Sequence, residues 1–190
     1  MFLEEHWGQI PATDFFSVEV WTPIGLKTIF VLFVIDIKSR RVDLAGLTRI
    51  PNEAFMAQVA RNLIDCMDGF LGGHRFLICD RDTKFTKQFK HALEAAGVEV
   101  LLTPVMVPNC NAYAERFVFS IKSECTNRVV FFGERHFREA VTSHLEHYHF
   151  ERAHQGLGNL RIESGTSDGA GNVECVERLG GLLKCYRRAA

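Results

Sequence analysis

The sequence has no long hydrophobic run. Its longest apolar stretch, Ile29 to Ile35, has seven residues and ends at Asp36, whereas a helix that spans a membrane needs about 20. The first residues include two acids, Glu4 and Glu5, and no basic segment, which argues against a secretory signal peptide. We therefore expect neither a membrane span nor a membrane partner.

An excess of charge of one sign and closely spaced cysteine pairs are also missing. The 190 residues include 22 basic and 23 acidic side chains, for a formal net charge of −1. Any basic surface must therefore come from local clustering. The six cysteines contain no C-x-x-C pair, and reduced thiols fit them better than a disulfide framework does. We expect a cytoplasmic protein of a prokaryote, or an equivalent reducing compartment.

Tryptophan and tyrosine are rare, with two and three residues against sixteen phenylalanines, so the core is expected to be built largely on phenylalanine. The shares of hydrophobic and charged residues, 47% and 24%, are typical of a globular chain and exclude a disordered or fibrous one. A chain of this length buries on the order of 70% of its unfolded surface, which is enough for a core without disulfides.

The order of the expected elements indicates the fold class. Three strands joined by short links come first and are typical of an antiparallel meander. Two later strands are separated by helices, so they are expected to pair in parallel through right-handed crossovers. The sequence thus predicts an α/β fold with a mixed five-stranded sheet flanked by helices. Strands are expected at 13–20, 27–37, 41–47, 76–79 and 98–102, and helices at 53–67, 85–96, 108–128 and 134–150.

Three carboxylates stand out by their placement. Asp14 lies in the first expected strand among apolar residues, Asp80 directly follows a short apolar strand, and Glu115 lies on an expected helix. An acid inside an apolar strand is costly to bury unless it pairs or binds a metal. Three acids that converge at a sheet edge can hold one or two Mg²⁺ ions, and two ions promote in-line phosphoryl displacement. Taken singly, each acid is more simply explained as a turn residue, a helix cap or a solvated charge.

The spacing of these acids occurs together with further motifs. Asp14 and Asp80 are 66 residues apart, and Asp80 and Glu115 are 35 apart. Together these features resemble the catalytic core of retroviral-type integrases and insertion-sequence transposases, the Asp–Asp–(35)–Glu enzymes of the RNase H-like superfamily. The motifs are Thr13-Asp14-Phe15, Phe33 to Asp36 with Ser39-Arg40-Arg41, Cys79 to Phe85, Pro104, Pro108, Asn111, Ala114-Glu115-Arg116, Ile121 to Glu124 and Tyr148 to Leu157.

The resemblance covers about residues 11–160, so residues 1–160 are expected to form the catalytic core and 161–190 a partly extended C-terminal tail. It implies an RNase H-like fold with Asp14, Asp80 and Glu115 as the catalytic and metal-binding triad. It also implies Mg²⁺ or Mn²⁺ as cofactor, with two ions once DNA is bound. The implied enzyme is a polynucleotidyl transferase that nicks DNA at the end of a mobile element and joins the freed 3′-hydroxyl to target DNA. Its implied partners are DNA and further copies of the chain, in a homodimer or larger oligomer.

Five basic residues are candidates for contacts to DNA phosphates. Lys122 follows Glu115 by seven residues, which is two helical turns, so the two share a helix face. An exposed Glu–Lys array explains that pair equally well. The full candidate set is Lys122, Arg116, Lys84, Arg152 and His154.

Several alternatives stay open. Asp82, 33 residues before Glu115, competes with Asp80, and Arg40 and Arg41 are more simply residues of a hairpin turn. The histidines near residue 147 invite a zinc site, but no cysteine pair has the spacing of a zinc finger. No helix-turn-helix region precedes the core, so weak and unselective DNA binding is expected. The other functions considered are a catalytically impaired or co-opted core for DNA binding or dimerisation, and an RNase H-like nuclease without strand transfer.

Overall fold

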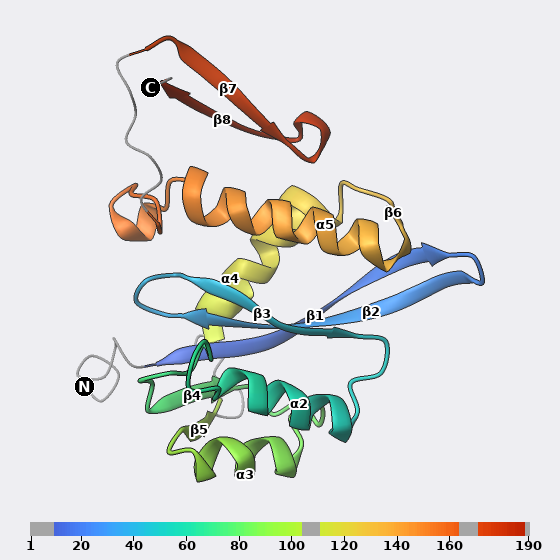
Figure 1. The fold of residues 1–190 in the computed structure, drawn as a ribbon, viewed down its shortest axis with the longest axis vertical. Helices are drawn as coiled ribbons and strands as arrows, with labels where there is room; N and C mark the ends of the chain where they lie inside the picture. Colours follow the sequence, from blue (N-terminus) through green and yellow to red (C-terminus); the bar gives the residue numbers. More distant parts are fainter. Residues whose placement is uncertain (1–9, 104–110, 164–170, 189–190) are drawn as a thin grey trace. The chain divides into compact units, whose positions relative to one another are not determined.

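The computed structural model describes residues 10–103, 111–163 and 171–188 (Figure 1). The expected Pro104 and Pro108 positions lie outside these residues. The chain divides into two compact units, and strand β1 and helix α4 each pass from one unit into the other. Unit 1 comprises Met1–Glu19 and Lys27–Val118, and unit 2 comprises Val20–Leu26 and Phe119–Ala190.

The central sheet has the strand order β3-β2-β1-β4-β5. Strand β2 pairs with β3 in antiparallel fashion, whereas β1 pairs with β4 and β4 with β5 in parallel. The predicted mixed α/β sheet is confirmed. Its strands are β1 (Pro11–Thr22), β2 (Gly25–Asp36), β3 (Val42–Thr48), β4 (Phe76–Cys79) and β5 (Glu99–Leu102).

A sixth strand, β6 (Phe131–Phe132), was not predicted. It pairs in parallel with Val20 and Trp21 at the end of β1, inside unit 2. Two residues carry no periodic pattern, which explains why the sequence did not reveal this strand.

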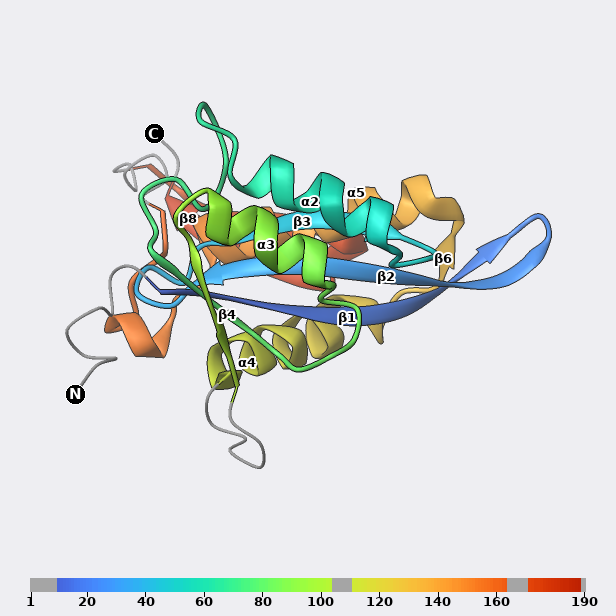
Figure 2. The same cartoon turned by 90° about the horizontal axis from the view of Figure 1, so that it is seen from below.

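Helices α2 (Glu53–Leu63) and α3 (Lys87–Ala95) cover one face of the sheet in unit 1, and the first turns of α4 (Ala112–Ile121) lie on the other face (Figure 2). The first two helices begin at capping side chains, because Asn52 accepts a hydrogen bond from the backbone N–H of Phe55 and Thr86 one from Phe89. At Gly46 of β3 an added Cβ would lie 2.8 Å from the Phe55 ring, so only glycine allows α2 to approach this closely.

Alternate residues of β2 pack into two apolar layers, one on each face of the sheet. Leu32 and Val34 join the buried cluster under α2 and α3, which also contains Phe89. Phe33 points to the opposite layer, where its ring centroid lies 4.8 Å from that of Phe117 on α4. Fully buried phenylalanines in both layers confirm the expected phenylalanine-rich core.

Unit 2 is built around α5 (Gly133–Glu146), which continues into the π-helix η4 (His147–Glu151). A second π-helix, η3 (Lys122–Thr126), follows α4. The predicted helices 108–128 and 134–150 thus correspond to α-helices that each end in a π-turn. A short 3₁₀ turn, η5 (Gln155–Leu157), comes next. None of the helices in the described part of the chain is long and apolar enough to cross a membrane.

The C-terminal tail contains an antiparallel hairpin of β7 (Val173–Arg178) and β8 (Leu183–Arg188), joined by the 3₁₀ turn η6 (Leu179–Gly181). Arg178 anchors it to the helical part of unit 2. The guanidinium Nε donates to Glu151 at 2.8 Å, and Nη1 pairs with Glu146. The boundary at residue 160 between core and tail stays a prediction.

His144 is the buried polar group of α5 that lacks a partner. Its side chain is fully buried, and neither ring nitrogen has a hydrogen-bond partner among the described residues. Burial, together with the positive charges of His147, Arg152 and His149, lowers the pKa of His144 to about 3. The folded protein therefore keeps this imidazole neutral.

Truncation of a buried phenylalanine tests the core. Phe89→Ala is expected to lower the free energy of unfolding by about 3–5 kcal/mol, because it leaves a cavity under α3. Phe119→Ala is the matched control, since that ring is 69% exposed. Urea unfolding followed by circular dichroism measures both. A cost below about 1 kcal/mol for Phe89→Ala would contradict the packing described.

The pH dependence of stability tests whether the folded protein keeps His144 neutral. Between pH 6.5 and about 3 the unfolded chain binds a proton at His144 that the folded protein does not bind, so stability falls as the pH falls through this window. Relative to His144→Phe, the wild-type protein is expected to lose about 1 kcal/mol per pH unit there. Chemical unfolding at a series of pH values measures the difference. The exposed His91→Gln is the control, and parallel curves for wild type and His144→Phe would refute the assignment.

Candidate active site

Asp14 lies near the start of β1, between Thr13 and Phe15, and is half-buried. Its Oδ1 accepts a hydrogen bond of 2.7 Å from the backbone N–H of Phe15. Burial is the main cause that raises the pKa of Asp14 from 3.8 to about 6. The Phe15 hydrogen bond opposes this rise without cancelling it.

Asp80 is exposed directly after β4, at the carboxyl end of that strand. Its Oδ1 accepts hydrogen bonds from the Arg81 N–H at 2.7 Å and from the Thr103 hydroxyl at 3.0 Å. Thr103 directly follows β5, the neighbour of β4 in the sheet. The sequence analysis missed Thr103, although a hydroxyl at the same end of the adjacent parallel strand is the signal that identifies it.

Glu115 is exposed on the first turns of α4. The helix start is tied to β1 by Asn111, whose side-chain amide donates to the Thr13 carbonyl at 3.4 Å. Asn111 is 7% exposed, and its Oδ1 has no hydrogen-bond partner among the described residues. Asn111 belongs to the motifs that resemble the integrase family, but no role was predicted for it. Its side chain contacts the carbonyl of Thr13, the residue directly before Asp14.

The three predicted carboxylates form one electrostatic cluster within unit 1. After burial, the negative charges that raise the pKa of Asp14 come from Asp80, Glu115 and Asp82, in that order. Residues far apart in the chain therefore lie close enough for their charges to repel. Such repulsion is what a bound cation relieves.

Asp82, the alternative to Asp80 as a site residue, is paired with the side chain of Lys84. Its carboxylate lies 2.5 Å from the Lys84 ammonium and also accepts from the Lys84 N–H at 2.9 Å. Partial burial would raise the pKa of Asp82, but these contacts lower it below its usual value. Lys84 is thereby engaged, which makes Asp80 the less neutralised acid of the two.

The other residues predicted to contact DNA phosphates differ in the exposure of their side chains and in their contacts with other residues of the chain. Arg116 is exposed on α4. Lys122, the first residue of η3 in unit 2, is half-buried. Arg152 pairs with Glu124 at 2.9 Å, also contacts Ser120 and lies over the Tyr148 ring.

His154 is likewise engaged within unit 2. Its Nε2 lies 2.8 Å from the Tyr148 carbonyl oxygen, and the two rings pack edge to face at 4.6 Å. These contacts explain a structural role for His154 without DNA, and its contact with DNA stays a prediction.

The donor set fits Mg²⁺ or Mn²⁺ in its chemistry, since hard carboxylate oxygens are the ligands these ions prefer. The raised pKa of Asp14 is consistent with a site that lacks a neutralising positive charge. Among the described residues, the Asn111 Oδ1 also lacks a hydrogen-bond donor. Within residues 10–103, 111–163 and 171–188, however, no three His, Cys, Asp or Glu side chains lie close enough to hold a metal together. The carboxylates must therefore move closer for a closed metal site to form.

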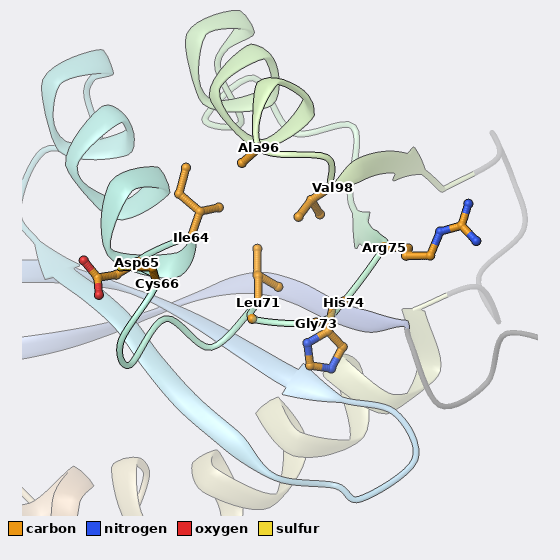
Figure 3. A pocket seen from close by; sticks show the side chains of 10 residues that line it. Ile64, Asp65, Cys66, Leu71, Gly73, His74, Arg75, Ala96 and Val98 are labelled. Atoms are coloured by element: carbon orange, nitrogen blue, oxygen red, sulfur yellow. The ribbon is translucent and has the colours of Figure 1, made fainter.

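A separate pocket of unit 1 lies at the carboxyl ends of α2 and α3 (Figure 3). It has a volume of about 350 Å³. Ile64, Leu71 and Val98 point into the space between the helices, and His74 lies at its edge. None of the residues that line this pocket belongs to the predicted triad.

Comparisons with known proteins agree with the fold. Residues 96–161 match a family model described as integrase core domain. Comparison with curated proteins gives no match. One similar solved structure is the catalytic core domain of HTLV-2 integrase in complex with magnesium, in a dimeric form, at 12% identity and a TM-score of 0.55. The match covers 74% of this chain and 86% of that one.

Two further solved structures are similar. The catalytic core domain of BIV integrase has 13% identity and a TM-score of 0.57, covering 82% of this chain and 91% of that one. An intasome of simian T-cell lymphotropic virus gives 12% identity and a TM-score of 0.55, with coverages of 96% and 67%. The chain thus has the RNase H-like fold of integrase catalytic cores. The expected kinship with insertion-sequence transposases stays a prediction.

Replacement of Asp14 tests the repulsion between the carboxylates of the cluster. Asp14→Asn is expected to stabilise the metal-free protein at neutral pH by on the order of 1 kcal/mol, because it removes a half-buried charge and keeps an oxygen for the Phe15 N–H. Millimolar Mg²⁺ is expected to raise the melting temperature of the wild type and not that of Asp14→Asn. Thermal unfolding with and without Mg²⁺ measures both.

The exposed Asp43→Asn serves as the charge-matched control. It is expected to keep the Mg²⁺ response of the wild type. Destabilisation by Asp14→Asn, or an equal Mg²⁺ response in all three proteins, would contradict the electrostatic cluster.

Proposed function

We propose that this chain is the catalytic core of a metal-dependent polynucleotidyl transferase that nicks DNA and joins a 3′-hydroxyl to target DNA. One observation carries the proposal: β1 and β4 pair in parallel with Thr13 opposite Cys79, which brings Asp14 and Asp80 to neighbouring positions. Burial raises the pKa of Asp14, and the charges of Asp80 and Glu115 raise it further. The match of residues 96–161 to the integrase core domain supports it. Residues 1–160 would form the catalytic core, as the spacing of the motifs predicts.

Asp14, Asp80 and Glu115 would hold the divalent cations. When bound, Mg²⁺ or Mn²⁺ activates an attacking oxygen and stabilises the leaving oxygen of a phosphodiester. The chain's own contribution is to orient the carboxylates. The Thr103 hydroxyl fixes Asp80, and the Asn111 amide ties the helix of Glu115 to the strand of Asp14.

DNA is the proposed partner, and Arg116 is the candidate phosphate contact with the freest side chain. It is exposed on α4, next to Glu115. Lys122, Lys84, Arg152 and His154 complete the proposed set. The net charge of −1 keeps general electrostatic attraction to DNA weak, so binding should depend strongly on these few contacts. We also propose a homodimer or larger oligomer, since the similar HTLV-2 core is described in dimeric and trimeric forms.

A second candidate is a core that keeps the fold and serves DNA binding or dimerisation without catalysis. It is favoured by the separation of the acids, which leaves no group of three metal-ligating side chains among the described residues. It is also favoured by the engagement of Lys84 with Asp82 and of Arg152 with Glu124. An RNase H-like nuclease without strand transfer is the third.

A plasmid assay with Mn²⁺ and a labelled duplex that ends in a 3′-hydroxyl distinguishes these functions. We expect nicked plasmid and plasmid joined to the duplex. Asp80→Asn is expected to lose both products, because it removes a metal ligand. Asp82→Asn is expected to keep them within a few-fold, because Asp82 pairs with Lys84.

The pattern of products decides between the candidates. Nicking without joining would favour the nuclease. Plasmid binding with neither nicking nor Mn²⁺ binding, the latter measured by calorimetry with DNA present, would favour the non-catalytic core. Loss of activity in Asp82→Asn but not in Asp80→Asn would show that the 35-residue spacing selects the wrong acid.

A further inference from the structure

Arg40, in the turn between β2 and β3, has a backbone conformation that its residue type disfavours. Its φ of 66° lies in the left-handed region, where a side chain other than glycine is strained. Strain of this kind persists only where the surroundings fix the residue, and it concentrates at functional sites. The strained residue therefore needs an explanation beyond that of a simple hairpin turn.

Hydrogen bonds of Asp36 and Ser39 fix the surrounding turn, and the Arg40 side chain adds one to the Ile37 carbonyl. Asp36 Oδ1 accepts hydrogen bonds from the Ser39 N–H at 2.6 Å and the Ser39 hydroxyl at 2.7 Å. Asp36 Oδ2 lies 3.1 Å from His74 Nε2. The Arg40 N–H donates to the Asp36 carbonyl at 2.9 Å, and the Arg41 carbonyl accepts from the Asp36 N–H at 2.9 Å. These contacts fix the backbone of the turn and, with it, the direction in which the Arg40 side chain leaves the chain.

That direction leads to the start of α4. The Arg40 guanidinium carbon lies 3.7 Å from the centroid of the Tyr113 ring, which is a stacked cation–π contact, while Nη1 donates to the Ile37 carbonyl. Tyr113 is the second residue of α4 and precedes Glu115 by two residues. The β2–β3 turn is thereby fastened to the helix turn that carries Glu115, and all of these residues belong to unit 1.

Glu115 depends on such anchors because its own side chain is exposed. Three contacts bracket it along the helix. Asn111 before it reaches β1 at 3.4 Å, which is a long hydrogen bond, and Phe117 after it packs on Phe33. The Arg40 contact with Tyr113 lies two residues before Glu115.

We propose that Arg40 is a positioning residue of the carboxylate site, which acts through Tyr113 to fix the first turn of α4 and, with it, Glu115. The inference rests on the proposed function in so far as Glu115 is a metal ligand. The competing role is a direct contact between Arg40 and a DNA phosphate. The two differ in a testable way, because a phosphate contact needs only the charge whereas positioning needs the planar stack.

Four variants and one control separate the roles. Arg40→Gly removes the side chain and suits the left-handed backbone, so it is expected to fold. Arg40→Lys keeps the charge without the planar stack. Tyr113→Ala removes the ring, Tyr113→Phe keeps it, and Lys38→Ala removes a positive charge from an exposed position of the same turn.

The primary readout is amide hydrogen exchange of residues 115–118 in the metal-free protein, because these are the first N–H groups that can donate to a carbonyl at the start of α4. Arg40→Gly, Arg40→Lys and Tyr113→Ala are expected to speed it about fivefold to tenfold, the size of a lost cation–π contact. Tyr113→Phe and Lys38→Ala are expected to match the wild type. The double variant Arg40→Gly/Tyr113→Ala is expected to be no faster than either single one.

The second readout is Mn²⁺ affinity by calorimetry, where the same three variants are expected to bind about fivefold to tenfold more weakly. Wild-type exchange rates in Arg40→Gly or in Tyr113→Ala would overturn the positioning role. It would also be overturned if Arg40→Lys behaved as the wild type while Arg40→Gly alone lost DNA affinity and salt dependence. Absence of Mn²⁺ binding in the wild type contradicts the proposed function instead, and the exchange rates still decide the role of Arg40.

Discussion

Repulsion between carboxylates is the constraint on which the candidate site depends. Asp14 is held in a strand where water reaches it only in part, and the charges of Asp80 and Glu115 act on it from two other segments of the chain. A fold does not gather like charges unless other contacts offset their repulsion. In unit 1 those contacts are apolar packing on both faces of the sheet and a small number of hydrogen bonds at its edge.

The remaining charged residues near the motifs show the opposite arrangement. Asp82 is neutralised by Lys84, and Asp36 by His74 and the hydrogen bonds of Ser39, so that the pKa of Asp36 falls to about 2 although burial alone would raise it. In unit 2, Arg152 is paired with Glu124. Acids with similar sequence surroundings thus divide into two groups. Asp82 and Asp36 lie against the basic side chains of Lys84 and His74. Among the described residues, the hydrogen-bond partners of Asp14 and Asp80 are uncharged N–H and O–H groups, which leaves these two carboxylates available to a cation.

Local patterns were sufficient to predict most of the fold and the positions of the three acids. Strand β1 carries Asp14 near its start, and Asp80 directly follows the apolar run of β4, so both acids could be placed on the sheet. Local patterns alone did not predict the contacts near these acids, because they join residues 23 and 98 positions apart, Thr103 with Asp80 and Asn111 with Thr13. Thr103 becomes predictable only once β5 is known to lie beside β4. Such pairs depend on strand order and helix placement, which no local period encodes.

The hairpin turn at Arg40 was predicted, whereas the contact of Arg40 with Tyr113 and the C-terminal hairpin were missed for different reasons. Arg40 has the sequence of an ordinary hairpin turn, and its contact with Tyr113 depends on where α4 begins. Strands β7 and β8 are largely exposed on both faces, so their residues lack the alternation by which a half-buried strand is predicted. The contact of Arg40 with Tyr113 was missed because it depends on long-range packing. The hairpin was missed because its strands have no buried face.

The hairpin of β7 and β8 also affects how the protein behaves at high concentration. Within the described residues no further strand pairs with either edge, so backbone N–H and C=O groups along both edges can accept a strand from another molecule. Charged side chains occur along both strands, and Glu177 pairs with Lys184 at 2.8 Å across the hairpin. A foreign strand added at either edge would bring apolar residues against these charges at a cost in desolvation. Charged side chains along exposed strand edges disfavour the addition of a foreign strand, and salt weakens this effect because it screens the charges.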